Sequence, residues 1–355
     1  MDTMNNPNSD SVEHLQRYLL LPRRPVGFKE VDGSIESVDP QTKIRPVVVT
    51  SNPKPDLVGL RSGQRSGLLQ LDGEALKIEG CGVERALGKK GSYRDEHRGT
   101  PVGGYLLSVA QKRVDRILKT NQRLTQDGWP VSYNPVAIIR YGKEFRYSPY
   151  GIWGVFAKLF GGNPDTLAEE LAAPVIGIKG DTKASEFYTL KPQDRRAAGI
   201  IAFRLGLMAG AQNRALGAKQ RNAITNTNAF SRYARNYVAF VEGEQVYLAR
   251  VDDEDAFLYR NITDPLEGYR GVDVLISTAL GALNEDEEEE EEEQDEEGEK
   301  VEGYAREVLG GKHHPYRSKS FRLQFERGYE LGYAKPDDRR PITRADLRVA
   351  YGLAI

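Results

Sequence analysis

Short apolar runs bounded by turn residues predict several β-strands in the first half of the chain. Residues 45–50 contain the apolar run Val-Val-Val and are followed by Ser-Asn-Pro, and residues 136–141 contain the similar run Val-Ala-Ile-Ile. Residues 67–80 hold two such runs joined by an Asp-Gly pair, which predicts a hairpin. Residues 1–40 are polar and interrupted by prolines, so we expect no regular element there beyond a short helix or strand at 15–21.

Apolar residues at spacings of three and four predict helices. Thr100-Pro101 offers an N-cap and a first-position proline, and apolar residues from Leu106 to Ile117 then recur on one face. A second helix, at 193–218, is rich in alanine and glycine, so we expect it to pack closely against its neighbours. The remaining predicted elements are helices at 167–173, 272–283, 301–309 and 320–333 and strands at 236–241 and 245–251.

The charge along the chain is uneven. The formal net charge is −2, but residues 285–299 contain 13 acidic residues and no basic one. Without these 13 of the 52 acidic residues, 50 basic residues face 39 acidic ones, a formal charge of +11. A basic body suits an anionic partner, either a nucleic acid or an acidic protein. The acidic tract cannot bury apolar surface, so we expect it to be disordered.

The location that these features favour is the cytoplasm. Cys81 is the single cysteine, which excludes an intrachain disulfide and favours a reducing compartment. No apolar run approaches the roughly 20 residues of a membrane span, so no membrane partner is expected.

Lys77 is the first candidate for chemistry. It lies in the second strand of the predicted hairpin, after three evenly spaced glycines, Gly59, Gly63 and Gly67. Glycines let backbone N–H groups approach phosphates, and a strand lysine supplies a fixed positive charge, so the pattern indicates a nucleotide phosphate site. An ordinary hairpin whose lysine is solvated at the sheet edge is the alternative.

Three features follow one another in the order found in protein kinases. The sequence Ala-Leu-Lys-Ile at 75–78 resembles the strand-lysine motif, and Asn236, which opens a strand, is similar to the metal-binding asparagine. The next strand leads to Asp252 and Asp253, which resemble the metal-binding aspartate. The chain therefore resembles the protein-kinase-like superfamily and, within it, the selenoprotein O type of pseudokinase adenylyltransferases.

This resemblance implies an α+β fold with two lobes, a small β-rich N-lobe with one helix and a larger, mostly helical C-lobe. The expected division is an N-terminal extension (1–44), a nucleotide-binding lobe (45–147), a helical lobe with the metal-site strand pair (148–284), the acidic tract (285–300) and a C-terminal helical segment (301–355).

The resemblance also implies ATP and Mg²⁺ as cofactors. Lys77 would pair with the phosphates beside the three glycines, and Asn236, Asp252 and Asp253 would hold the metal. The implied activity is transfer of a phosphoryl or adenylyl group to a protein or small-molecule acceptor.

The sequence departs from the kinase pattern in three places. Asp-Asp-Glu-Asp at 252–255 stands where a kinase has Asp-Phe-Gly. Ala-Phe-Ser at 229–231 stands where a kinase has its His-Arg-Asp base. The predicted helix offers Gln111 and Asp115 where a kinase has the glutamate that pairs with the strand lysine. A nucleotide-binding pseudokinase or a degenerate scaffold therefore stays open beside an active transferase.

Two other functions fit parts of the sequence. Lys-Ile-Glu-Gly at 77–80 matches the lysine motif of polynucleotide ligases and capping enzymes, in which the lysine itself carries the nucleotide. Residues 141–145 and Glu242 would then be the later motifs of that family. Alternatively, the chain is a basic nucleic-acid-binding or scaffold protein without catalysis, in which aromatic residues beside basic ones stack on unpaired bases.

Overall fold

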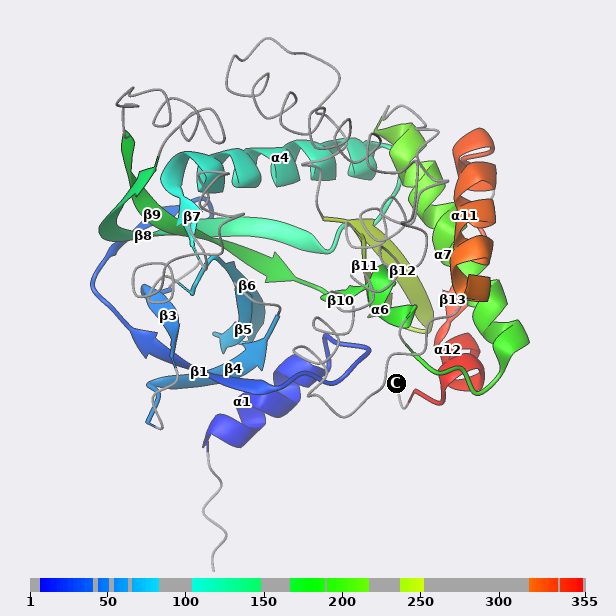
Figure 1. Cartoon of the computed structure of the whole chain (residues 1–355), viewed down its shortest axis with the longest axis horizontal. Helices are drawn as coiled ribbons and strands as arrows, with labels where there is room; N and C mark the ends of the chain where they lie inside the picture. The colour runs from blue at the N-terminus through cyan, green and yellow to red at the C-terminus, as the bar shows by residue number, and fades with distance from the viewer. Residues whose placement is uncertain are drawn as a thin grey trace, which may run out of the picture.

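The chain has an α+β fold with two antiparallel sheets and six helices in its described part (Figure 1). The computed structural model describes residues 7–40, 44–50, 54–62, 66–82, 104–147, 167–188, 190–216, 237–251, 319–337 and 339–353. No helix in these ranges combines the length and apolar character that a bilayer crossing requires.

The large sheet has nine strands in the order β2-β8-β9-β6-β5-β4-β1-β3, with β7 also paired to β9. Their bounds are β1 (Pro25–Glu30), β2 (Ser34–Ser37), β3 (Val47–Thr50), β4 (Leu57–Arg61), β5 (Ser66–Leu71), β6 (Glu74–Glu79), β7 (Tyr105–Leu106), β8 (Tyr133–Tyr147) and β9 (Leu167–Ile178). The sheet curls so that strands near its two ends meet. The Tyr141 hydroxyl of β8 donates to the carbonyl oxygen of Val47 in the edge strand β3, at the other end of the strand order, at 3.0 Å. One buried cluster fills the inside of the curl and takes residues from both ends of the sheet.

The predicted hairpin is confirmed as β5 and β6. Asp72 and Gly73 form its two-residue turn with φ values of 49° and 83°, which a primed turn requires. The sheet extends beyond the predicted 45–147 lobe on both sides, because strands at 25–37 and 167–178 belong to it.

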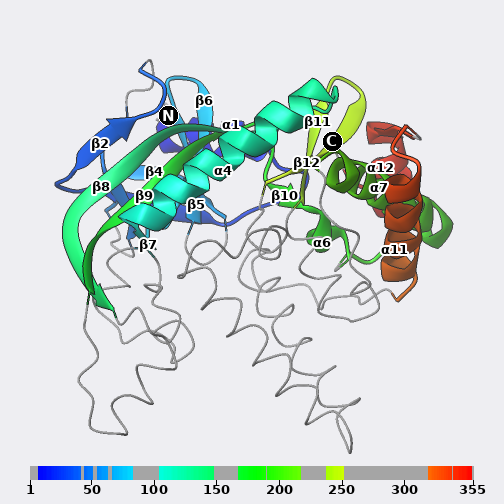
Figure 2. The ribbon, with the colours of Figure 1, turned by 90° about the horizontal axis from the view of Figure 1, so that it is seen from above.

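Helix α4 (Leu107–Gln126) lies across β8 and β9 (Figure 2). Ala110, Val114 and Ile117 are buried, which confirms the predicted apolar face. The predicted start at Thr100 is wrong, since the helix begins at Leu107. Tyr105 and Leu106 pair with β9 as a short strand, and a helix can begin only after that pairing ends.

The described residues after β9 form a small sheet and four helices. The sheet order is β10 (Thr182–Lys183), β11 (Tyr237–Glu242), β12 (Gln245–Arg250) and β13 (Ile342–Thr343). The helices are α6 (Ala184–Phe187), α7 (Arg195–Ala215), α11 (Lys319–Ala334) and α12 (Arg344–Tyr351). Asp194 caps α7 by accepting from the backbone N–H groups of Arg196 and Ala197, at 2.8 and 3.0 Å.

Helices α7 and α11 approach each other at glycines. A Cβ atom on Gly206 would lie 2.1 Å from the Phe325 carbonyl oxygen, and one on Gly332 would lie 2.1 Å from that of Leu207. Real Cβ contacts are never so short, so the backbones can meet only where side chains are absent. The close packing expected from the alanine and glycine content of α7 is confirmed.

The N-terminal segment contains more regular structure than its prolines suggested. Helix α1 (Pro7–Gln16) packs on β4 and β5, and Leu15 and Leu19 are buried between the two sheets. The expectation that residues 1–40 hold no regular element beyond one at 15–21 is wrong, because strands β1 and β2 lie in this segment. Pro25 is compatible with β1 because it is the first residue of the strand.

The short helix predicted at 167–173 is wrong, because these residues form the first half of β9. Leucine, alanine and glutamate are good helix formers, but such preferences amount to less than about 1 kcal/mol per residue, and the pairing of β9 with β8 over most of its length overrides them. The predicted elements at 272–283 and 301–309 and the acidic tract lie outside the described residues.

Candidate functional site: a buried charge network around Lys77

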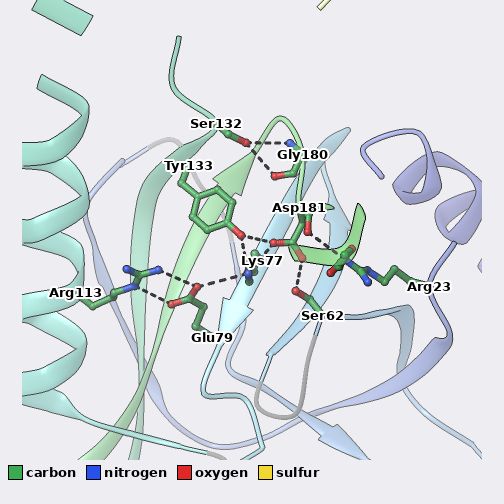
Figure 3. Close-up of polar contacts among 10 residues, drawn as sticks. Arg23, Ser62, Lys77, Glu79, Arg113, Ser132, Tyr133, Gly180 and Asp181 are labelled. Atoms are coloured by element: carbon green, nitrogen blue, oxygen red, sulfur yellow. Dashed lines mark hydrogen bonds and ion pairs between the residues drawn. The ribbon is translucent and has the colours of Figure 1, made fainter. Parts of the chain in front are cut away.

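Lys77 is a buried residue of the central strand β6, so the alternative of a solvated lysine at the sheet edge is wrong. Its side chain is on the same face of β6 as Glu79, and the residue is only 4% exposed. The ammonium group donates to the Asp181 carboxylate at 2.7 Å and to the Tyr133 hydroxyl at 2.6 Å (Figure 3). The fold therefore holds this cation in place with two partners from other segments.

Asp181 is the centre of the network. It follows β9, is 1% exposed, and accepts from the ammonium of Lys77 and the hydroxyls of Tyr133 and Ser62. Burial alone would raise the pKa of the Asp181 carboxyl, but the charges of Lys77 and Arg23 outweigh it and lower that pKa. Asp181 is thus an ionised, fully bonded carboxylate.

Glu79 connects Lys77 to helix α4. Its carboxylate accepts from Arg113 Nε at 3.0 Å and Nη2 at 3.3 Å, and lies 3.7 Å from the Lys77 ammonium. Burial would raise the pKa of Glu79, but Arg113 and Lys77 lower it to about 2. Helix α4 therefore contributes a cation, where a kinase helix would contribute the acid.

Arg23 extends the network to the N-terminal segment. Its guanidinium donates to both oxygens of Glu186, at 2.7 and 2.8 Å, and to the Asp181 carbonyl oxygen at 3.2 Å. The backbone N–H of Leu20 donates to the Thr182 hydroxyl at 2.9 Å. Residues 20–23 are thereby fastened to the connection between the two sheets.

The six charged groups compensate one another. Lys77, Arg113 and Arg23 face Asp181, Glu79 and Glu186, and none is more than 7% exposed. Removing charges from water costs several kcal/mol each, and close pairing offsets that cost.

The predicted glycines have packing contacts in this structure. A Cβ on Gly59 would lie 2.0 Å from the Leu68 carbonyl oxygen, and one on Gly67 would lie 2.3 Å from the Phe28 ring. Gly63, Asn236, Asp252 and Asp253 lie outside the described residues. Of the predicted site, the structure therefore places Lys77 in a polar network and the two described glycines in the sheet.

Sequence reasoning missed the rest of the network: the Lys77 partners Asp181, Tyr133 and Glu79, and the residues that contact Asp181 and Glu79 in turn, Arg23, Ser62 and Arg113. Reading 167–173 as a helix hid the continuous apolar run at 171–178, which is typical of a buried strand. A strand there would have drawn attention to Asp181, three residues after its end.

The described residues contain no group of three or more His, Cys, Asp and Glu side chains that could hold a metal ion. Magnesium binding therefore stays a prediction about residues outside these ranges. Comparisons with models of protein families, with curated proteins and with solved structures found no match to this chain.

Proposed function

We propose that the chain is a kinase-like nucleotide-binding protein in which Lys77 pairs with the phosphates of ATP. The observation that carries the proposal is the position of Lys77 on the third strand of the run β4-β5-β6-β9-β8. Helix α4 follows that strand in the chain and precedes β8, and a glycine-containing segment joins β4 to β5. A glycine-rich loop, a lysine on the third strand and a helix after it are the elements with which kinases hold the phosphates.

The hairpin β11–β12 supports the metal side of the proposal. Tyr237 pairs with Arg250 at the open end of the hairpin, and in the sequence Asn236 comes directly before β11 and Asp252 two residues after β12. Val251 belongs to the same buried cluster as Ala75 and Tyr133. Ala75 is two residues before Lys77 in the sequence, and the Tyr133 hydroxyl accepts a hydrogen bond from the Lys77 ammonium. Carboxylate and amide oxygens are suitable ligands for Mg²⁺, and we propose Asn236, Asp252 and Asp253 for that role.

ATP binding would require one exchange in the network. Phosphate oxygens would replace the Asp181 carboxylate as the partner of Lys77, so that the buried ammonium keeps an anionic acceptor. Glu79 and Arg113 would continue to position the ammonium from the other side. Transfer of a phosphoryl or adenylyl group would then depend on positioning and charge neutralisation.

The geometry favours this role over a covalent one. A lysine that attacks phosphorus needs a free, neutral amine, whereas Asp181 and Tyr133 both hold the Lys77 nitrogen within 2.7 Å. Glu242, a later motif of the ligase-like alternative, forms an ion pair with Lys179. The nucleic-acid-binding alternative stays a prediction.

Calorimetric titration of the full chain with ATP, with and without Mg²⁺, tests the proposal. The test variant is Lys77→Met with Asp181→Asn, which removes both charges of the buried pair together. The control is Lys179→Met with Glu242→Gln, which removes an ion pair whose side chains are 53% and 44% exposed. Circular dichroism melts confirm that each variant is folded.

We expect Mg²⁺-dependent ATP binding by the wild type and the control, and at least a tenfold loss of affinity in the test variant. The proposal is overturned if the wild type does not bind ATP, or if the test variant binds as well as the control. Incubation with α-labelled ATP distinguishes reversible ATP binding from the covalent alternative. Label retained on Lys77 after denaturation would identify a lysine-adenylated enzyme.

A further inference from the structure

A groove of about 400 Å³ lies at the N-terminal ends of α7 and α11, away from the Lys77 network. Arg195, Arg196 and Arg204 line it from α7, and Arg340 lines it from the segment before β13. Ile200 and Phe203 form an apolar surface between these cations. The groove uses none of the residues assigned to nucleotide or metal binding.

The groove carries an excess of positive charge. Arg204 pairs with Asp346 at 3.1 Å, and Asp194 is engaged in capping the helix. Within the described residues the side chain of Arg196 forms no hydrogen bond or ion pair. An anionic ligand is the complement of this surface.

The apolar surface adds a second requirement. Ile200 is 45% exposed although it lies between arginines, and Arg340 lies over the ring of Phe203 at 5.6 Å. Exposed apolar side chains with a charged rim are typical of binding surfaces. The ligand therefore needs an apolar group as well as negative charge.

The spacing of the arginines indicates what kind of ligand fits. Arg196 and Arg204 are eight residues apart in α7, which is about 12 Å along a helix. A single phosphate cannot reach both positions. An extended peptide advances about 3.3 Å per residue, so its residues i and i+4 are separated by about 13 Å and point to the same side.

We propose that this groove binds an extended acidic segment of a partner protein with the pattern acid-x-hydrophobic-x-acid. The two carboxylates would meet the cations at either end of the groove, and the hydrophobic side chain would contact Ile200 and Phe203. Arginine suits this role because its planar donors match a carboxylate in two hydrogen bonds. The proposal is independent of the nucleotide site.

Fluorescence anisotropy with a labelled Gly-Glu-Ala-Leu-Ala-Glu-Gly peptide tests the proposal on the full chain. The test variant is Arg196→Glu with Arg204→Glu, which reverses the charge at the two positions whose separation sets the peptide pattern. The charge-matched control is Lys119→Glu with Lys143→Glu, two exposed lysines on α4 and β8. Two further peptides replace both glutamates by glutamine or the leucine by alanine. Because the chain carries its own acidic tract, each measurement is repeated on a chain whose 13 acidic residues at 285–299 are changed to Gln and Asn.

We expect the test variant to weaken binding at least tenfold and the control to change it less than twofold. The glutamine peptide should not bind, the alanine peptide should bind several-fold more weakly, and higher salt should weaken binding. Binding only after the acidic tract is neutralised supports the proposal and identifies the tract as a competitor within the chain. The proposal is overturned if neither chain binds, if test and control variants lose affinity equally, or if inorganic phosphate competes as well as the unlabelled peptide.

Discussion

The Lys77 network and the α7–α11 helix pair both join segments that are distant in sequence, but by opposite means. At the network, six buried charged side chains hold the two sheets and the N-terminal segment together. At the helix pair, glycines allow backbones to touch because side chains are absent. The first arrangement depends on matched charge and so on pH, whereas the second depends only on volume.

This difference has a functional meaning. Under the proposed function, phosphate oxygens would take the place of the Asp181 carboxylate beside Lys77, because both carry negative charge. A backbone contact has no such substitute, and the helix pair is suited to be a fixed frame. The Lys77 network, and not the helix pair, is therefore the candidate functional site.

Removing Asp181 should have the largest effect on stability. The Asp181→Ala change leaves Lys77, which is 4% exposed, without its nearest carboxylate, and we expect a loss of about 3–5 kcal/mol in the free energy of unfolding. Replacing both partners, Lys77→Met with Asp181→Leu, should cost much less than the sum of the single changes, because no buried charge remains unpaired. Urea denaturation of the wild type, both single variants and the double variant measures this coupling. Additive losses would contradict a mutual dependence of the two charges.

The same network should make stability fall in acid. Glu79 has a pKa of about 2 in the folded protein against an ordinary value of 4.5, so its ionised form stabilises the fold above pH 4.5. Protonation between about pH 5 and pH 2 then removes up to about 3 kcal/mol, and Asp181, whose pKa is also lowered, acts in the same direction.

Urea denaturation at intervals from pH 7 to pH 3 measures this dependence. The Glu79→Gln variant should be less stable than the wild type at pH 7 and should show a shallower loss toward pH 3. An equal slope in both proteins would mean that Glu79 is not a source of the acid sensitivity.

The sequence was sufficient for the parts of the fold that depend on local signals. The hairpin of β5 and β6 is encoded by its Asp-Gly turn, and α7 lies within the alanine- and glycine-rich helix expected at 193–218. Lys77 was found because a lysine in an apolar strand is conspicuous. Its partners were not found from the sequence. Asp181 is 104 positions away from Lys77, and only the pairing of β9 with β6 brings the two residues together. The helical propensity of 167–173 also concealed that strand, since sheet pairing overrides a weak local preference.

The helix pair should respond to added volume and ignore pH. In Gly206→Ala the new methyl group would lie 2.1 Å from the Phe325 carbonyl oxygen and 2.8 Å from the Tyr329 nitrogen, so the helices must separate. We expect a loss of about 1–3 kcal/mol, even though alanine favours a helix by up to about 1 kcal/mol over glycine. Gly199→Ala is the matched control in the same helix, because its nearest neighbour would be Gln324 Cγ at 3.7 Å, and it should be neutral or stabilise by about 0.5–1 kcal/mol.

Urea denaturation of both glycine variants at pH 7 and at pH 4 completes the comparison. The difference between Gly206→Ala and the wild type should be the same at both values, because no titrating group takes part in the contact. A difference that grew or shrank with pH would show that the helix pair and the charge network are coupled. The helix pair would then be part of the switchable region, and exchange of the Asp181 partner at Lys77 would be expected to move α7 and α11 as well.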